Sequence, residues 1–179
     1  MDYQFKKIVD MKKDEVKEQV YTNINFLIRH YRWSKNKDFF ESISEKTGIP
    51  CRTISSWYYK EKLPELHHAE ITLLTSSLKV HFSDFVSTNI TEDNILPQSP
   101  DVFIPSNVAK QNILKLLIEH DIQNPDKFES FFESNYSSNY FYVLQRKRNH
   151  QRNLSWTFIV TAAYYFNISV GDLFKNEGD

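Results

Sequence analysis

Apolar residues recur every three or four positions through both halves of the chain, a spacing that predicts helices. In the first half, a helix that ends near Tyr31 has an apolar face formed by Val16, Val20, Ile24, Leu27 and Ile28. In the second half, Ser106 is a candidate N-cap for a helix whose apolar face is formed by Val108, Ile113, Leu116 and Leu117. The sequence has no pair of alternating runs joined by a tight glycine turn, so it predicts an all-α protein.

The two halves also resemble each other, which indicates an internal repeat. The segment LKVHFSDFV at 78–86 aligns with FNISVGDLF at 166–174, at an offset of 88 residues. Between the halves, residues 87–105 contain three of the six prolines and three acidic residues without a basic one. Because proline removes a backbone donor and disfavours helix before it, we expect a linker here. The expected domains are residues 1–86 and 106–179.

Composition narrows the possible functions. The 179 residues carry 22 basic and 23 acidic side chains, a net charge of −1, so any binding to nucleic acid must depend on charge placement. Three glycines exclude dinucleotide-binding and phosphate-binding loops, and a single cysteine excludes an intrachain disulfide and a cysteine zinc cluster. The lone Cys51, the lack of a long apolar run and the lack of a signal peptide lead us to expect a cytoplasmic protein without membrane contact.

The most informative segment is KTGIPCRTISSWYYKEKLP at 46–64. Gly48 lies where a helix ends and the chain reverses, a left-handed position that glycine adopts readily. Pro50 then presets the backbone at the start of the next helix. Ile54 and Trp57 are expected to face inward from that helix. A short helix with small polar and basic groups outside fits a DNA major groove, and the expected outward residues are Cys51, Arg52, Ser55, Ser56 and Tyr59.

This segment resembles the helix-turn-helix of the Cro and lambda-repressor type, also called the XRE family. Gly48 at the turn, the triplet TIS at 53–55, Trp57 and the pair Leu63-Pro64 fall at that family's positions. The segment at 78–86 is similar to the family's closing helix. The resemblance covers residues 20–86.

The second half resembles the same fold more loosely. Asn135 replaces the turn glycine, and Phe141 and Leu144 replace the two inward residues. The segment YYFNISVGDLF at 164–174 is similar to the closing segment of the family. The resemblance implies two lambda-repressor-like helix-turn-helix domains in tandem, the second divergent, joined by a proline-containing linker.

The resemblance implies a sequence-specific transcriptional regulator, more often a repressor, from a bacterium, a phage or a mobile element. Arg52 is the leading base reader, because a guanidinium pairs bidentately with guanine. In the first domain, base edges would be contacted by Cys51, Arg52 and Ser56, and phosphates by Thr53, Tyr59, Lys60 and Lys62. In the second domain, the expected contacts to double-stranded DNA are Ser138, Asn139 and Tyr142, with a basic cluster of Arg146, Lys147, Arg148 and Arg152.

Two questions of assembly and partner stay open. Two domains on one chain would read two half-sites as a pseudo-dimer, or a homodimer would form through either end. The N-terminal stripe of Phe5, Ile8 and Val9 either pairs with a second subunit or packs onto its own domain.

The alternative function is a protein-binding scaffold that inhibits or modulates a host nuclease or polymerase, as some anti-CRISPR proteins do while repressing their own promoters. The family's glutamine before the turn is replaced by Phe40 in the first copy and Lys127 in the second, which favours this alternative. So do the near-neutral charge and the candidate surface tyrosines Tyr58, Tyr59, Tyr140 and Tyr142. Binding of single-stranded nucleic acid by these tyrosines is a third possibility.

Catalysis and metal binding are not expected. The sequence places no nucleophile beside a base. His67 and His68 are adjacent on an expected helix, where their side chains would point about 100° apart, so we expect no joint metal site. The expectation is therefore a protein that is not an enzyme and has no cofactor.

Overall fold

The computed structural model describes residues 3–145 and 154–176, and every regular element in these ranges is helical. The all-α prediction is confirmed for this part of the chain. The first half contains α1 (Tyr3–His30), α2 (Asn36–Thr47), α3 (Cys51–Tyr58), α4 (Glu70–Ser77) and α5 (Phe82–Ser87). A 3-10 helix, η1 (Glu92–Asn94), leads to α6 (Pro105–Glu119), α7 (Pro125–Phe131), α8 (Ser138–Gln145), α9 (Trp156–Phe166) and the 3-10 helix η2 (Gly171–Phe174). Among the described helices, none combines the length and apolar character that a membrane span requires.

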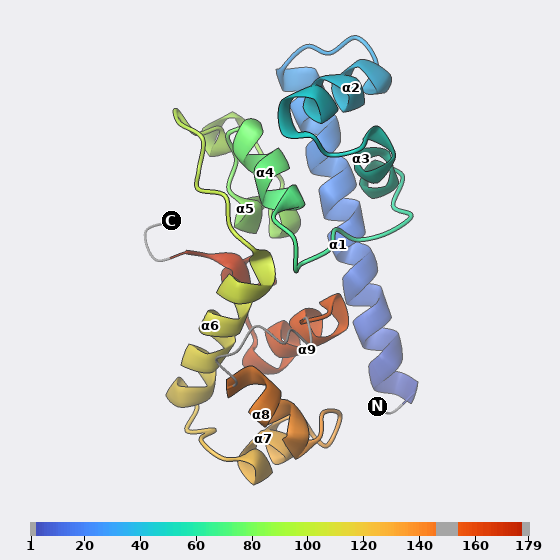
Figure 1. Cartoon of the computed structure of the whole chain (residues 1–179). Coiled ribbons are helices and arrows are strands. Elements are labelled where there is room, and N and C mark those ends of the chain that lie inside the picture. The colour runs from blue at the N-terminus through green and yellow to red at the C-terminus, as the bar shows by residue number, and fades with distance from the viewer. Residues whose placement is uncertain (1–2, 146–153, 177–179) are drawn as a thin grey trace.

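The long helix α1 packs on both halves of the chain (Figure 1). Its C-terminal part lies against α3 and α5, and its N-terminal part reaches α9. The ring of Phe5 lies 5.8 Å from that of Tyr164 and 5.5 Å from that of Tyr165, centroid to centroid. Phe5 of the N-terminal stripe therefore packs on the second half of its own chain, whereas the sequence predicted packing on its own domain or on a second subunit.

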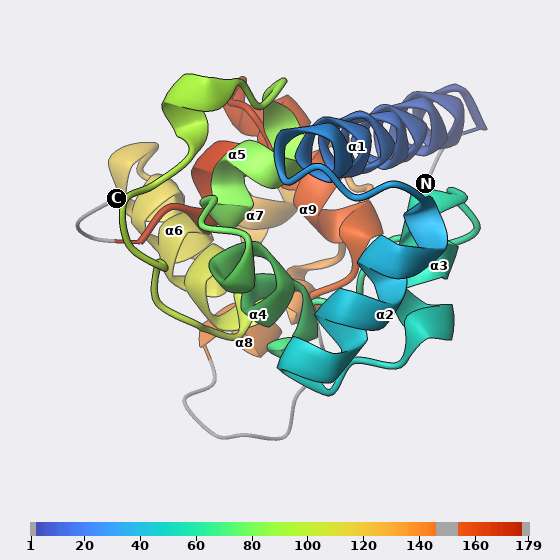
Figure 2. The ribbon, with the colours of Figure 1, turned by 90° about the horizontal axis from the view of Figure 1, so that it is seen from above.

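The closing elements of the two halves, α5 and η2, lie against each other (Figure 2). They belong to the two segments that align at an offset of 88 residues, and the ring centroids of Phe82 and Phe174 are 4.9 Å apart. The approach is close, because a Cβ added at Gly171 would lie 2.5 Å from the carbonyl oxygen of Ser83. Gly171 and Ser83 are aligned residues of the repeat, so the two halves meet through the same part of their folds.

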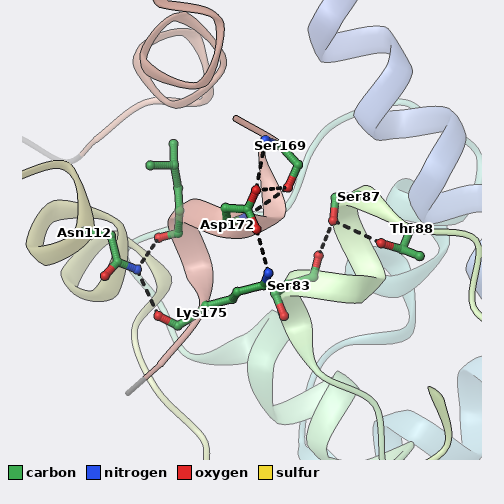
Figure 3. Close-up of polar contacts among 8 residues, drawn as sticks. Ser83, Ser87, Thr88, Asn112, Ser169, Asp172 and Lys175 are labelled. Carbon is green, nitrogen blue, oxygen red and sulfur yellow. Dashed lines mark hydrogen bonds and ion pairs between the residues drawn. The ribbon is translucent and has the colours of Figure 1, made fainter. Parts of the chain in front are cut away.

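Each half also holds its closing element with an asparagine from its first helix. In the first half, the amide of Asn23 on α1 donates to the carbonyl oxygens of Phe85 and Thr88, at 2.9 and 2.8 Å. In the second half, Asn112 on α6 donates to the carbonyl oxygens of Leu173 and Lys175, at 3.1 and 2.9 Å (Figure 3). This shared contact supports the internal repeat.

The proline-bearing stretch after α5 is held along the first half. The amide of Leu96 donates to the carbonyl oxygen of Lys79 at 2.8 Å. The hydroxyls of Ser76 and Thr72 donate to the carbonyl oxygens of Pro100 and Phe103, at 2.7 and 2.6 Å. The stretch expected as a linker is thus fixed by hydrogen bonds at several points along its length.

Three local expectations are wrong. Ile104 is the N-cap of α6 and Pro105 its first residue, so Ser106 does not cap the helix. In the second half, the left-handed residues before α8 are Glu133 and Ser134, with φ of 49° and 59°, and not the residue aligned with the turn glycine, Asn135. Residues 66–69 form turns and bends before α4, so the two histidines at 67 and 68 are not on a helix.

Candidate nucleic-acid interface

The connection between α2 and α3 has the geometry that the glycine predicts. Gly48 is left-handed, with φ of 73°, and its amide donates to the carbonyl oxygen of Ser44 at 2.8 Å. A Cβ added at Gly48 would meet nothing within 4 Å, so glycine is favoured by the backbone conformation and not by lack of space. Pro50 takes the N-cap position of α3, with φ of −57°. The chain therefore reverses sharply and starts α3 at Cys51.

Helix α3 is covered on two sides, by α1 and by α2. Ile54 and Trp57 are fully buried, as their spacing predicts. Ser56, which lies between these two residues in the sequence, was expected to face outward, which is wrong. Ser56 is 6% exposed, and its hydroxyl donates to the carbonyl oxygen of Thr53 at 2.7 Å. The amides of Glu61 and Lys62 donate to the carbonyl oxygen of Ser56, so the loop after α3 folds back onto this residue.

Aromatic and amide side chains fix α3 against its neighbours. Phe40, which the sequence resemblance aligns with a glutamine, packs on Tyr58 and Tyr59 with ring centroids 5.5 and 6.4 Å away. The Tyr58 hydroxyl accepts a bond from Asn36 at 2.7 Å and donates to Asn25 at 3.0 Å. Burial raises the pKa of Tyr58. Tyr58 therefore belongs to the packing between α1, α2 and α3 and is not a surface residue.

The surface of α3 is formed by a small set of residues. Arg52 is exposed in the first turn, and Tyr59 is 61% exposed just after the helix. Lys62 is exposed in the following loop, and Thr53 is half-buried. Cys51 is also half-buried, with its thiol directed to the carbonyl oxygen of Phe40 at 3.5 Å. The accessible positive charge at the start of α3 is that of Arg52.

Lys60 lies in a different environment from the other candidate phosphate contacts. Its Nζ lies 2.6 and 2.7 Å from the two carboxylate oxygens of Glu18 on α1. The same atom lies 4.2 Å from the centroid of the Tyr21 ring. The backbone of Lys60 is left-handed, with φ of 60°. Its charge is therefore balanced by Glu18, and a phosphate would have to displace that carboxylate.

Helix α8, in the second half of the chain, presents a different surface. Phe141 and Leu144 are buried on the inner face of α8, as expected. Asn139 is exposed and Tyr142 is 50% exposed, on the outer face. The amide of Ser138, at the start of α8, donates to a carboxylate oxygen of Glu129 at 2.9 Å. A carboxylate thus occupies the helix N-terminus, where a phosphate would otherwise be favoured.

The two remaining predicted features of the second half are the surface tyrosine at 140 and the basic cluster after α8. Tyr140 is half-buried, packing on Tyr136 and Phe158 with centroids 5.0 and 4.5 Å away, and burial raises its pKa to about 12. It is therefore not an exposed stacking platform. The basic cluster lies outside the described residues and comprises Arg146, Lys147, Arg148 and Arg152.

Sequence reasoning missed the carboxylates that compete with phosphate. Glu18 and Glu129 lie 42 and 9 residues from the groups they bind, and neither spacing distinguishes them from ordinary surface acids. The replacement of glutamine by Phe40 was visible in the sequence, but its packing on the tyrosines was not. Among the described residues, Glu18 balances the charge of Lys60, and Glu129 accepts a bond at the start of α8.

The candidate interface consists of α2, α3 and the turn between them. It presents Arg52 at the start of a short, firmly packed helix. No protein-family model, no curated protein and no solved structure matches the chain.

Proposed function

We propose that the chain is a sequence-specific DNA-binding regulator of transcription, acting as a repressor, and that it inserts α3 into the major groove. The observation that carries the proposal is the exposed Arg52 in the first turn of α3, directly after the left-handed turn at Gly48. In helix-turn-helix proteins the N-terminal residues of the second helix contact base edges. A guanidinium there pairs with O6 and N7 of guanine.

Phosphate contacts would position α3 on the duplex. Thr53, Tyr59 and Lys62 flank Arg52 along the accessible side of α3 and the loop after it. Lys60 joins them when it exchanges Glu18 for a phosphate oxygen. Such contacts fix orientation without reading sequence. Ser56 is buried and has no part in this interface.

The second copy contributes less to base reading in this proposal. Asn139 and Tyr142 are accessible on α8, but Glu129 places a negative charge at the start of that helix. The two copies meet through α5 and η2, so one chain would act as a covalent pseudo-dimer of two helix-turn-helix units. We expect an asymmetric site in which the half read by α3 is the more specific.

Selection from a random library of DNA duplexes tests this function. The proposal predicts enrichment of one sequence pattern, with affinity that falls as salt rises. A half-site contacted by α3 should contain a guanine whose enrichment depends on Arg52. If no pattern is enriched, or all duplexes bind equally and weakly, the regulator proposal is refuted.

A second candidate function is binding to a protein target. The 61% exposure of Tyr59 favours it, because tyrosine is enriched at interface hot spots. Substitution of Tyr59 by alanine would then abolish capture of the target while leaving the fold intact. Under the DNA proposal the same variant loses a single phosphate contact, so the two candidates predict different losses.

A further inference from the structure

A cluster of potential metal ligands lies in the segment between α3 and α4, just before α4 begins. The Oε2 atom of Glu65 lies 3.0 Å from Nε2 of His67 and 3.8 Å from Nε2 of His68. One ligand atom from each of the three residues lies within 4.8 Å of the other two. The two imidazole rings are 4.1 Å apart. The turn therefore brings together side chains that a helix would have separated.

The distances between these ligand atoms are close to those between neighbouring ligand atoms around a bound metal ion. Bonds of about 2.0–2.1 Å in a tetrahedral zinc site place neighbouring ligand atoms about 3.3 Å apart. The atoms of Glu65, His67 and His68 need to move by an ångström or so, within the range of side-chain rotation. Imidazole nitrogens and a carboxylate oxygen are donors that suit zinc and its neighbours in the first transition series.

The exposure of the three side chains is also compatible with ion binding. The side chains of Glu65 and His68 are 54% and 57% exposed, and that of His67 is 28% exposed. An ion can therefore reach the cluster from solvent, and water can complete its coordination. The charge of Glu65 offsets part of the charge of a divalent ion.

We propose that Glu65, His67 and His68 form a binding site for a divalent transition-metal ion such as Zn²⁺, with two nitrogen ligands and one oxygen ligand. Each histidine contributes Nε2 and the glutamate contributes a carboxylate oxygen. The site is independent of the proposed DNA contacts, since none of its three residues belongs to α3 or to the loop at 59–62.

The backbone around the site links it to the second half of the chain. The carbonyl oxygen of Pro64 accepts a bond from Nε1 of Trp156 at 2.6 Å. The carbonyl oxygen of Leu66 accepts a bond from the amide of Ser106 at 2.8 Å. An ion held by Glu65, His67 and His68 would fix the turn that receives both bonds. Metal binding should therefore stabilise the folded chain as a ligand that binds only the native state does.

Isothermal titration of the full chain with Zn²⁺ tests the site. The expected result is one ion bound per chain, with affinity reduced at least about tenfold in His67→Ala, His68→Ala and Glu65→Gln, since even residues outside the coordination shell change metal affinity about 10–100-fold. The matched control is His30→Gln. His30 forms a similar pair with Glu92, Nδ1 to Oε2 at 2.8 Å, without a second histidine.

Electron paramagnetic resonance with Cu²⁺ gives an independent readout. Coupling to imidazole nitrogen should be present in the parent chain and reduced in either histidine variant. Circular dichroism in the presence of a chelator checks that the variants fold. We expect them to fold because the replaced side chains are partly or largely exposed. No Zn²⁺ binding by the parent chain, or equal binding by all three variants and the control, overturns the proposal.

Discussion

Replacing Gly171 with alanine perturbs the contact between the two halves directly. The added Cβ would lie 2.5 Å from the carbonyl oxygen of Ser83 and 2.9 Å from Cβ of Ser87 (Figure 3 shows both serines beside η2). Distances below 3.0 Å are not tolerated, and the Ser83 oxygen belongs to the backbone of α5. Rotation of a side chain cannot relieve the clash, so α5 and η2 must move apart.

The expected loss follows from this overpacking. Inserting a carbon into a packed contact costs about 1–3 kcal/mol, and a backbone obstacle places Gly171→Ala toward the upper end. For a chain of this length, each kcal/mol shifts the melting temperature by about 2–4 °C, so we expect a fall of about 4–12 °C. Thermal unfolding followed by far-ultraviolet circular dichroism measures it.

A second variant separates backbone from side-chain clashes. Ser87→Ala alone should change stability little, because the lost bond from Oγ to the carbonyl oxygen of Ser83, 2.7 Å long, is offset by the helix propensity of alanine. Combined with Gly171→Ala, it should leave most of the loss in place. A Gly171→Ala protein that melts with the parent chain would refute the close packing of α5 on η2.

Three further perturbations have defined outcomes. Tyr58→Phe removes the hydroxyl that joins the side chains of Asn25 and Asn36. Both amides are half-buried, so the loss should be that of ordinary hydrogen bonds, about 0.5–1.5 kcal/mol each, measurable as a lower melting temperature. Glu18→Gln releases Lys60, so DNA binding should tighten and its logarithmic salt slope should steepen by about 0.9; an unchanged slope would exclude Lys60 as a phosphate contact. The hydrogen bond from Lys175 lowers the pKa of Asp172 in the folded chain. The free energy of unfolding should therefore decrease as the pH falls below about 4, where this carboxylate becomes protonated. In an acid titration, the free energy of unfolding of Asp172→Asn should decrease less than that of the parent chain.

The apolar spacing predicted the inner faces of the short helices correctly. Ile54 and Trp57 are buried because residues three apart lie on one side of a helix, and the same holds for Phe141 and Leu144. The left-handed turn at Gly48 was also predictable, since glycine adopts positive φ without a steric penalty. Local rules therefore gave the turn and the orientation of α3.

Contacts between distant segments were not predictable from spacing. Ser56 is buried, and the loop after α3 folds back to donate two amides to its carbonyl oxygen, a contact that helical spacing does not indicate. The fixed path of residues 87–105 depends on hydroxyls of Thr72 and Ser76, which look like any surface hydroxyls in a sequence. The pairing of Lys60 with Glu18 is likewise set by tertiary structure.

The site before α4 illustrates the same limit. An expected helix at His67 and His68 separated their side chains, whereas the turn brings both to Glu65. The local backbone conformation therefore determines whether these three side chains can bind the same ion. Turn conformations depend on the segments that hold them, here through bonds from Ser106 and Trp156.

Base preference measured for Arg52→Ala tests the central claim, that α3 reads DNA. We expect loss of discrimination at one base pair, worth about 1–3 kcal/mol, with preferences elsewhere in the site retained. The matched control is Lys62→Ala, which should weaken all sequences equally and make the salt dependence shallower. If Arg52→Ala instead binds the selected site with the parent's affinity and the parent's base preferences, α3 does not read the sequence.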